Sequence, residues 1–204
     1  MGTTVRLKNV RLAFAHQLFT PSAFEEGQIK KFGCDAILVP GSSVEKKTGV
    51  DEAGRSTWAP TTMEAVLLEV ANEVTKGKGA TWLAGLENSK KCYRNGDLRT
   101  TPGGDVYDGY EGCWYVTAKN KARPTLLDER KRPLTEADGK PYSGCYATVT
   151  VDVYPMTEAK KKGVHGALKG VQFLRDGDAF GGGGVASPDD FEDVTEGADA
   201  SDLV

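Results

Sequence analysis

The sequence has few of the residues that metal sites require. It contains only four cysteines and two histidines, and no two cysteines form a Cys-x-x-Cys pair. Structural zinc sites usually take two ligands from one tight turn, and neither histidine lies near a cysteine in the chain. We therefore expect no metal and no cofactor, and four buried, reduced thiols that pack as small apolar side chains. These are Cys34, Cys92, Cys113 and Cys145.

Catalytic motifs are also lacking. Residues 41–48, GSSVEKKT, approach the phosphate-binding pattern G-x-x-x-x-G-K-[ST], but Lys46 occupies the position of the second glycine and no amphipathic helix begins at Thr48. We interpret this segment as a solvated polar loop. Neither His16 nor His165 has a nucleophile motif beside it. The sequence therefore predicts no catalytic residues and no enzyme.

Long apolar runs are absent as well. No stretch approaches the roughly 18 apolar residues of a membrane span, and the first residues, MGTTVRLKNVRLAF, alternate polar and apolar side chains instead of resembling a signal peptide. We expect a cytoplasmic protein that does not bind membranes. A chain of 204 residues is long enough for one domain with a real core.

Positive charge is missing from the end of the chain. From Pro188 to Val204 there is no Lys or Arg, whereas residues 1–187 hold all 26 basic residues and 22 of the 29 acidic ones, a net of +4. Such a segment buries too little apolar surface to fold. We expect residues 1–180 to form the domain, and residues 181–204 to form a glycine hinge with a disordered acidic tail. The acids of the tail are Asp189, Asp190, Glu192, Asp193, Glu196, Asp199 and Asp202.

Short strand patterns dominate the body. In residues 5–14 apolar residues alternate, slip by one position near Asn9 and resume, as they would across a β-bulge. Residues 29–40 indicate a strand that Pro40 ends, and YATVTVDVY at 146–154 has a strict period of two. Further strand-like pieces are ATWLAGL, GCWYVTAK, RPTLLD and VQFL.

One helix is predicted within TTMEAVLLEVANEVTKGKG, at residues 61–79. A threonine is available as its N-cap, apolar residues recur at helical spacing from Met63 to Val74, and Gly77 and Gly79 would end it. The polar stretch 41–56 is expected to be a loop. Several short antiparallel strands with one helix favour a small barrel or sandwich.

Residues 90–132 combine aromatic and basic side chains. Single-stranded nucleic acid offers flat bases that stack on aromatic rings and phosphates that attract Lys and Arg. In GCWYVTAK, strand alternation puts Trp114 on one face, which we assign to the core, and Tyr115 with Lys119 on the other, which we assign to the ligand. The alternative is that the basic residues of this stretch are ordinary surface charge and that its tyrosines pack at the rim of a barrel.

Three blocks resemble a known family: YDGYEGCWYVTAKNKARPTLLD, YSGCYATVTVDVY and GVHGALKGVQFLRDGDAFGGG. From about Val5 to Gly184 the chain is similar to phage single-stranded DNA-binding proteins whose OB-fold is related to that of the T7-type protein. The resemblance implies a five-stranded antiparallel barrel with one inserted α-helix, nonspecific binding of single-stranded DNA, and a role in replication or recombination. T7-type tails typically end on an aromatic residue, whereas this one ends on Leu203-Val204 and carries Phe191 inside.

We therefore expect a mainly β protein that binds single strands by stacking and by phosphate contacts. The acidic tail would occupy the DNA groove when DNA is absent, or recruit replication or recombination proteins; a homodimer is a further expectation. A single-strand annealing recombinase and a virion or assembly protein are the alternatives. The expected DNA contacts are Tyr93, Arg94, Tyr107, Tyr110, Tyr115, Lys119, Lys121, Arg123, Arg6, Lys8, Lys30 and Lys31.

Overall fold

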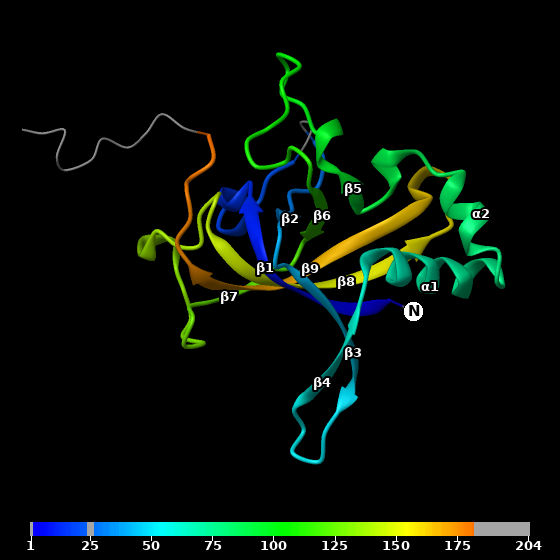
Figure 1. Cartoon of the computed structure of the whole chain (residues 1–204), viewed down its shortest axis with the longest axis horizontal. Helices are drawn as coiled ribbons and strands as arrows, with labels where there is room; N and C mark the ends of the chain where they lie inside the picture. The colour runs from blue at the N-terminus through cyan, green and yellow to red at the C-terminus, as the bar shows by residue number, and fades with distance from the viewer. Residues whose placement is uncertain (1, 24–26, 182–204) are drawn as a thin grey trace, which may run out of the picture.

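The computed structural model describes residues 2–23 and 27–181. Within them the chain forms nine strands and two α-helices (Figure 1). The strands are β1 (Thr3–Ala13), β2 (Phe32–Leu38), β3 (Ser43–Val50), β4 (Ser56–Thr61), β5 (Tyr93–Asn95), β6 (Trp114–Asn120), β7 (Thr125–Leu127), β8 (Tyr146–Met156) and β9 (Gly163–Arg175). The helices are α1 (Met63–Thr75) and α2 (Gly79–Ala84).

Strand β1 organises the sheet because it pairs with three other strands. Its first half pairs with β3, its last residues pair with β2, and β8 pairs along most of its length, all antiparallel. The register with β8 shifts between Leu7 and Val10, and Asn9 between them has a φ of 55°. The predicted bulge is therefore confirmed, and it keeps the apolar residues on both sides of it facing the core.

The sheet runs in the order β5-β6-β2-β1-β8-β9-β7, and β3 and β4 form a hairpin beside β1. This hairpin projects away from the body (Figure 1). Gly166 of β9 also approaches β6, where a side chain would lie 2.8 Å from the carbonyl oxygen of Thr117. The mainly β fold is confirmed, but the sheet is open and not wholly antiparallel, because β7 pairs with β9 in parallel. There are nine strands instead of five because the hairpin and the short edge strands β5 and β7 add to β1, β2, β6, β8 and β9.

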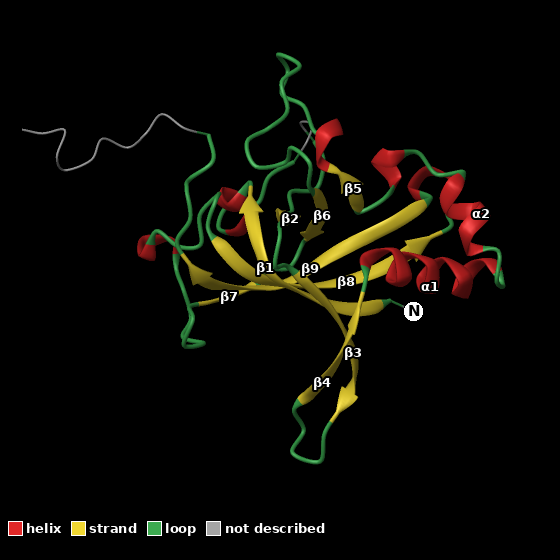
Figure 2. Ribbon diagram, viewed as in Figure 1, coloured by secondary structure: helices red, strands yellow, loops and turns green. Residues whose placement is uncertain are grey.

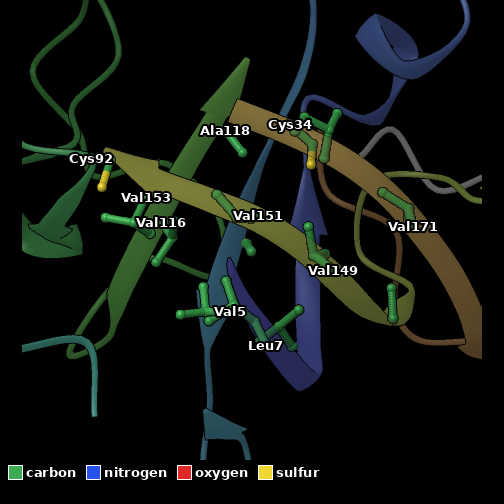
Figure 3. Packing of buried hydrophobic residues seen from close by; sticks show 14 of the residues in the cluster. Val5, Leu7, Cys34, Cys92, Val116, Ala118, Val149, Val151, Val153 and Val171 are labelled. Carbon is green, nitrogen blue, oxygen red and sulfur yellow. The ribbon is translucent and has the colours of Figure 1, made fainter. Parts of the chain in front are cut away.

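The main core lies between these five strands and α1. Alternate residues of β1 and β8, such as Val5, Leu7 and Val151, are completely buried and point toward one another (Figure 3). All four cysteines are free; Cys34, Cys92 and Cys145 are buried, as predicted, whereas Cys113 is only partly so. Burial raises the pKa of Cys92 to about 12 and that of Cys145 to about 11, so both thiols stay protonated.

Helix α1 confirms the predicted helix and its cap. The side chain of Thr62 accepts a hydrogen bond from the backbone N–H of Ala65, at 3.2 Å. Met63, Val66 and Val70 are buried on one face. With α2, the helix covers one end of the sheet beside β8 and β9 (Figure 2).

Two sequence predictions about local structure were wrong. The segment expected to be a polar loop, within residues 41–56, forms β3 and the start of β4. The segment ATWLAGL, expected to be a strand, forms α2, whose first N–H, on Gly79, donates to the Asn72 side chain at 2.9 Å. The predicted acidic tail lies outside the described residues.

Candidate functional site

A groove of about 440 Å³ opens where strands β2, β5, β6 and β9 come together. Strands β2 and β6 pair in antiparallel register, which places Asp35 directly opposite Thr117. Strand β5 lies on the other side of β6, with Arg94 opposite Tyr115. The backbone N–H of Cys92 donates to the carbonyl of Val164 at 2.8 Å, which joins the segment before β5 to β9. Segments far apart in sequence thus form one concave surface.

Positive charge dominates the lining. Among the described residues, five basic side chains line the groove, against one carboxylate, that of Asp35. Lys31 precedes β2, Lys119 lies on β6, and the other three come from the segment around β5. The five bases are Lys31, Lys91, Arg94, Arg99 and Lys119. This concentration of charge is suited to a polyanion.

Aromatic rings line the same groove. Phe14 follows β1, with its backbone in the left-handed region at a φ of 55°, and Tyr154 lies on β8. His165 of β9 lies beside Tyr154, with ring centroids 5.8 Å apart, and its Nε2 is 2.9 Å from the carbonyl oxygen of Lys161. Phe14 also packs edge-on against Tyr107, at 5.5 Å between centroids. The groove lining therefore combines aromatic rings with cations.

The Asp35 carboxylate is the centre of a hydrogen-bond network beneath the groove. It is only 3% exposed, and it accepts a hydrogen bond from the Tyr110 hydroxyl at 2.7 Å and another from the Thr117 hydroxyl at 2.6 Å. Burial, with the neighbouring Asp35 carboxylate, raises the pKa of Tyr110 and keeps that hydroxyl protonated. The carboxylate is thus held in one orientation by two donors.

Two groove arginines join this network. The Arg94 Nη2 donates to the Thr117 hydroxyl at 2.6 Å, and the Arg99 Nη2 lies 3.7 Å from the Asp35 carboxylate. Burial works to lower the pKa of Arg99, but the neighbouring Asp35 charge together with Tyr115 and Tyr110 outweighs it, and the pKa is raised. The guanidinium groups also lie over rings, Arg94 over Tyr115 at 5.2 Å and Arg99 over Phe14 at 5.1 Å.

Three of the residues predicted to contact DNA line this groove. They are Lys31, Arg94 and Lys119. Lys119 lies on the face of β6 that alternation assigned to the ligand. Together they supply three of the five positive charges.

Two predicted contact residues are buried. Tyr110 is 1% exposed and Tyr115 is 2% exposed, and their rings pack edge to face at 4.9 Å in a second small core with Ala13 and Ile37. A buried ring offers no face to a base, so the expectation that Tyr115 is open to a ligand was wrong. Trp114, expected in the core, is 46% exposed and stacks on Tyr93 at 4.8 Å.

The other predicted contacts lie outside the groove lining. Tyr93 donates its hydroxyl to Glu64 of α1 at 2.8 Å, and Tyr107 packs behind Phe14. Arg6 and Lys8 pair with Glu45 of β3, at 2.9 Å and 3.3 Å. The remaining three are exposed: Lys30, Lys121 and Arg123.

Sequence reasoning missed several lining residues. Lys91 and Arg99 lie within the aromatic and basic stretch but were not selected, whereas Phe14 and Tyr154 come from strands outside it. Asp35 had a detectable signal, because a single carboxylate interrupts the apolar run in GCDAIL. Buried carboxylates are rare unless they are paired.

Among residues 2–23 and 27–181, no three His, Cys, Asp or Glu side chains cluster as metal ligands would. Within the same ranges no helix is both long enough and apolar enough to cross a membrane.

The sequence profile described as "Enterobacter phage Enc34, ssDNA-binding protein" matches residues 3–204, which is nearly the whole chain. The chain belongs to the Enc34 family of phage single-stranded DNA-binding proteins. A further relative is protein p50 of Acyrthosiphon pisum secondary endosymbiont phage 1, which is 37% identical over 195 residues and matched over 94% of each chain.

The solved structure of the bacteriophage Enc34 protein shares this fold. The single-stranded DNA-binding protein of bacteriophage Enc34, in complex with single-stranded DNA, aligns with a TM-score of 0.56 at 17% identity, over 87% of this chain and 89% of that one. The single-stranded DNA-binding protein gp2.5 of bacteriophage T7 aligns with a TM-score of 0.48 at 13% identity, over 93% of both chains.

Proposed function

We propose that this protein binds single-stranded DNA in the groove between β2, β5, β6 and β9, without reading base sequence. The observation that carries the proposal is the meeting of five basic side chains and two aromatic rings on one concave surface. Phosphates release counterions when they meet Lys and Arg, and each base stacked on a ring contributes about 1–3 kcal/mol. The Enc34 relative solved with single-stranded DNA supports this proposal.

The activity we propose is binding, with no bond made or broken. A protein of this kind coats exposed strands during phage DNA replication, recombination or repair in the cytoplasm of the infected host. No cofactor or metal is needed, because stacking and counterion release supply the affinity.

We propose that the seven carboxylates after Pro188 compete with DNA for the basic groove, or recruit replication or recombination proteins when DNA displaces them. Charge complementarity supports the first role, because the body up to residue 187 has a net charge of +4. The glycine run at 181–184 would serve as the hinge.

A titration of fluorescent oligo-dT at rising salt tests the proposed function. Each phosphate contact to a single strand adds about 0.7 to the salt slope, so five contacts predict a log–log slope of about −3.5. A duplex of equal length, measured in parallel, should bind more weakly because its bases are not free to stack. Equal affinity for the two substrates, or binding that ignores salt, would contradict the proposal and favour a virion or assembly role.

The same titration on a variant ending at Gly181 tests the tail. Removing seven negative charges should tighten DNA binding, most clearly at low salt, where the attraction between tail and groove is least screened. The comparison protein is full-length chain with the acids of the tail changed to their amides, which should tighten binding by a similar amount. Unchanged affinity in both proteins would refute competition by the tail.

A further inference from the structure

A carboxylate at the base of a groove built for anions needs an explanation. Among the residues that the structure describes, Asp35 is the one acidic residue in the groove lining, and its negative charge opposes binding of a phosphate chain. It is nonetheless buried and held by two hydroxyl donors, Tyr110 at 2.7 Å and Thr117 at 2.6 Å. Its position is therefore fixed by the fold.

The partners of Asp35 link it to both groove arginines. Thr117 donates to the carboxylate and accepts from Arg94 Nη2 at 2.6 Å, so its hydroxyl connects the two. Arg99 Nη2 faces the carboxylate directly at 3.7 Å. The guanidinium group of Arg94 also packs over the Tyr115 ring, and that of Arg99 packs over the Phe14 ring.

The protein satisfies these guanidinium groups only in part. In the part of the chain that the structure describes, two buried side-chain nitrogen or oxygen atoms have no hydrogen-bond partner, and they are Arg94 Nε and Arg99 Nε. A guanidinium group has five N–H donors in a planar fork that matches the oxygens of a phosphate. Each guanidinium group therefore has one buried N–H donor, on Nε, that the described protein groups leave unpaired.

We propose that Asp35 is a positioning residue for single-strand binding, because it fixes Arg94 through Thr117 and Arg99 directly, so that both guanidinium groups are ordered before they meet phosphates. The inference rests on the proposed function of the groove. Ordering a long side chain in advance removes a cost that binding would otherwise carry. The local loss of attraction to phosphate is outweighed by this preorganisation.

The Asp35→Asn variant distinguishes a positioning role from a simple effect of charge, because the two predict opposite changes in affinity for DNA. Removing a negative charge from a basic groove should tighten DNA binding if charge alone matters. If Asp35 positions the arginines, affinity for oligo-dT should fall by about tenfold, the cost expected when two long side chains lose their order. The matched control is Asp105→Asn, an exposed acid on the loop after Arg99, which should bind as tightly as wild type or more tightly.

Thr117→Val supplies a second test in case Asp35→Asn does not fold. It removes the hydroxyl that connects Arg94 to the carboxylate while keeping the shape of the side chain. Its control is Thr4→Val, which removes a similar hydroxyl-to-carboxylate bond, to Asp152 at 2.5 Å, between β1 and β8. We expect Thr117→Val to bind DNA more weakly and Thr4→Val to bind as wild type does. The salt slope of Thr117→Val should fall by about 0.7 for each arginine that no longer contacts a phosphate.

The outcomes are distinguishable. If wild type binds oligo-dT and folded Asp35→Asn binds equally well or better, the positioning role is refuted and the proposed function stands. If Asp35→Asn does not fold, Thr117→Val with wild-type affinity and slope refutes the positioning role. If wild type does not bind single strands at all, the proposed function fails and this inference fails with it. Thermal unfolding of each variant establishes that it is folded.

Discussion

Burial in the core changes the pKa of two single residues, Cys145 and Cys92. Burial raises the pKa of Cys145 from 9.0 to about 11 and that of Cys92 from 9.0 to about 12. Folding raises the pKa of both thiols. Their contribution to the free energy of unfolding is therefore fully present below the pKa of the unfolded chain, and it is lost as pH rises through the pKa of the folded protein. The window is therefore alkaline, from about pH 9 upward.

We predict that the free energy of unfolding falls between about pH 8 and about pH 10.5 under reducing conditions, because unfolded thiols ionise and buried ones do not. Two units of pKa shift correspond to about 2–3 kcal/mol for Cys145 once pH exceeds 11. Urea unfolding of Cys145→Ala at both pH values should show a smaller fall than wild type. Cys113→Ala, at a partly exposed site, is the control and should keep most of the fall. Equal falls in all three proteins would contradict the assignment.

At the same scale, alternation in β6 identified the two faces but not their surroundings. Val116 and Ala118 face the main core as predicted, yet Tyr115 on the opposite face is also buried, in the second small core. On that face Thr117 and Lys119 line the groove, whereas Tyr115 is covered by the second small core. Trp114 lies at the start of the strand, where its side chain stacks on Tyr93 of β5 and stays 46% exposed. Which end of a strand is covered depends on its neighbours, and the pattern within the strand does not record them.

Among the elements, β1 depends most on one unusual residue. Asn9 adopts a φ of 55°, which Asn tolerates and β-branched residues do not. Its side chain also donates to the carbonyl of Gly41 at 3.3 Å and accepts from Arg175 at 2.6 Å. The bulge lets one long strand pair with β3, β8 and β2 in turn.

We predict that Asn9→Val lowers the free energy of unfolding by about 2 kcal/mol, because valine is strained at positive φ and makes neither hydrogen bond. Asn9→Asp is the matched control; it tolerates the conformation and keeps the acceptor for Arg175, so it should cost much less. Urea denaturation measures both. If Asn9→Val were as stable as wild type, the bulge would not depend on this residue.

Elements with a strong periodic pattern were predictable, and those stabilised by neighbours were not. The apolar period and Thr62 cap of α1, and the strict alternation of β8, are written in their own residues. The β3–β4 hairpin carries charged residues that pair across strands, such as Glu45 with Arg6, and it has little apolar pattern. Helix α2 is only six residues long, too short to show a helical period, and its first N–H is held by the side chain of Asn72. Its own sequence therefore did not distinguish it from a strand.

For the whole molecule, the groove is a product of topology. Its lining comes from the end of β1, from β2, from the segment around β5, and from β6, β8 and β9. The sequence predicted the chemistry of the stretch 90–132, but Phe14 and Tyr154 enter only because β1 and β8 end beside it. Contacts between residues this far apart in sequence leave no local pattern, so the places of Phe14 and Tyr154 in the site could not have been predicted.

The last described residues are fixed to the body near this groove. The Phe180 ring packs on Gly109, whose φ of 79° and contact with the ring leave no room for a side chain. Arg11 lies over the same ring at 4.3 Å, and the N–H of Gly181 donates to Asp108 at 3.1 Å. The described part of the chain therefore ends beside the loop that also carries Arg99.

The most direct test of the account is where a single strand touches the protein. Ultraviolet cross-linking of oligo-dT to the full-length chain, followed by mass spectrometry of the peptides, maps that path. We predict cross-links in peptides that carry Phe14, Tyr154 or residues 91–99. Cross-links confined to the β3–β4 hairpin or to α1 would contradict the claim that the strand lies in the basic groove.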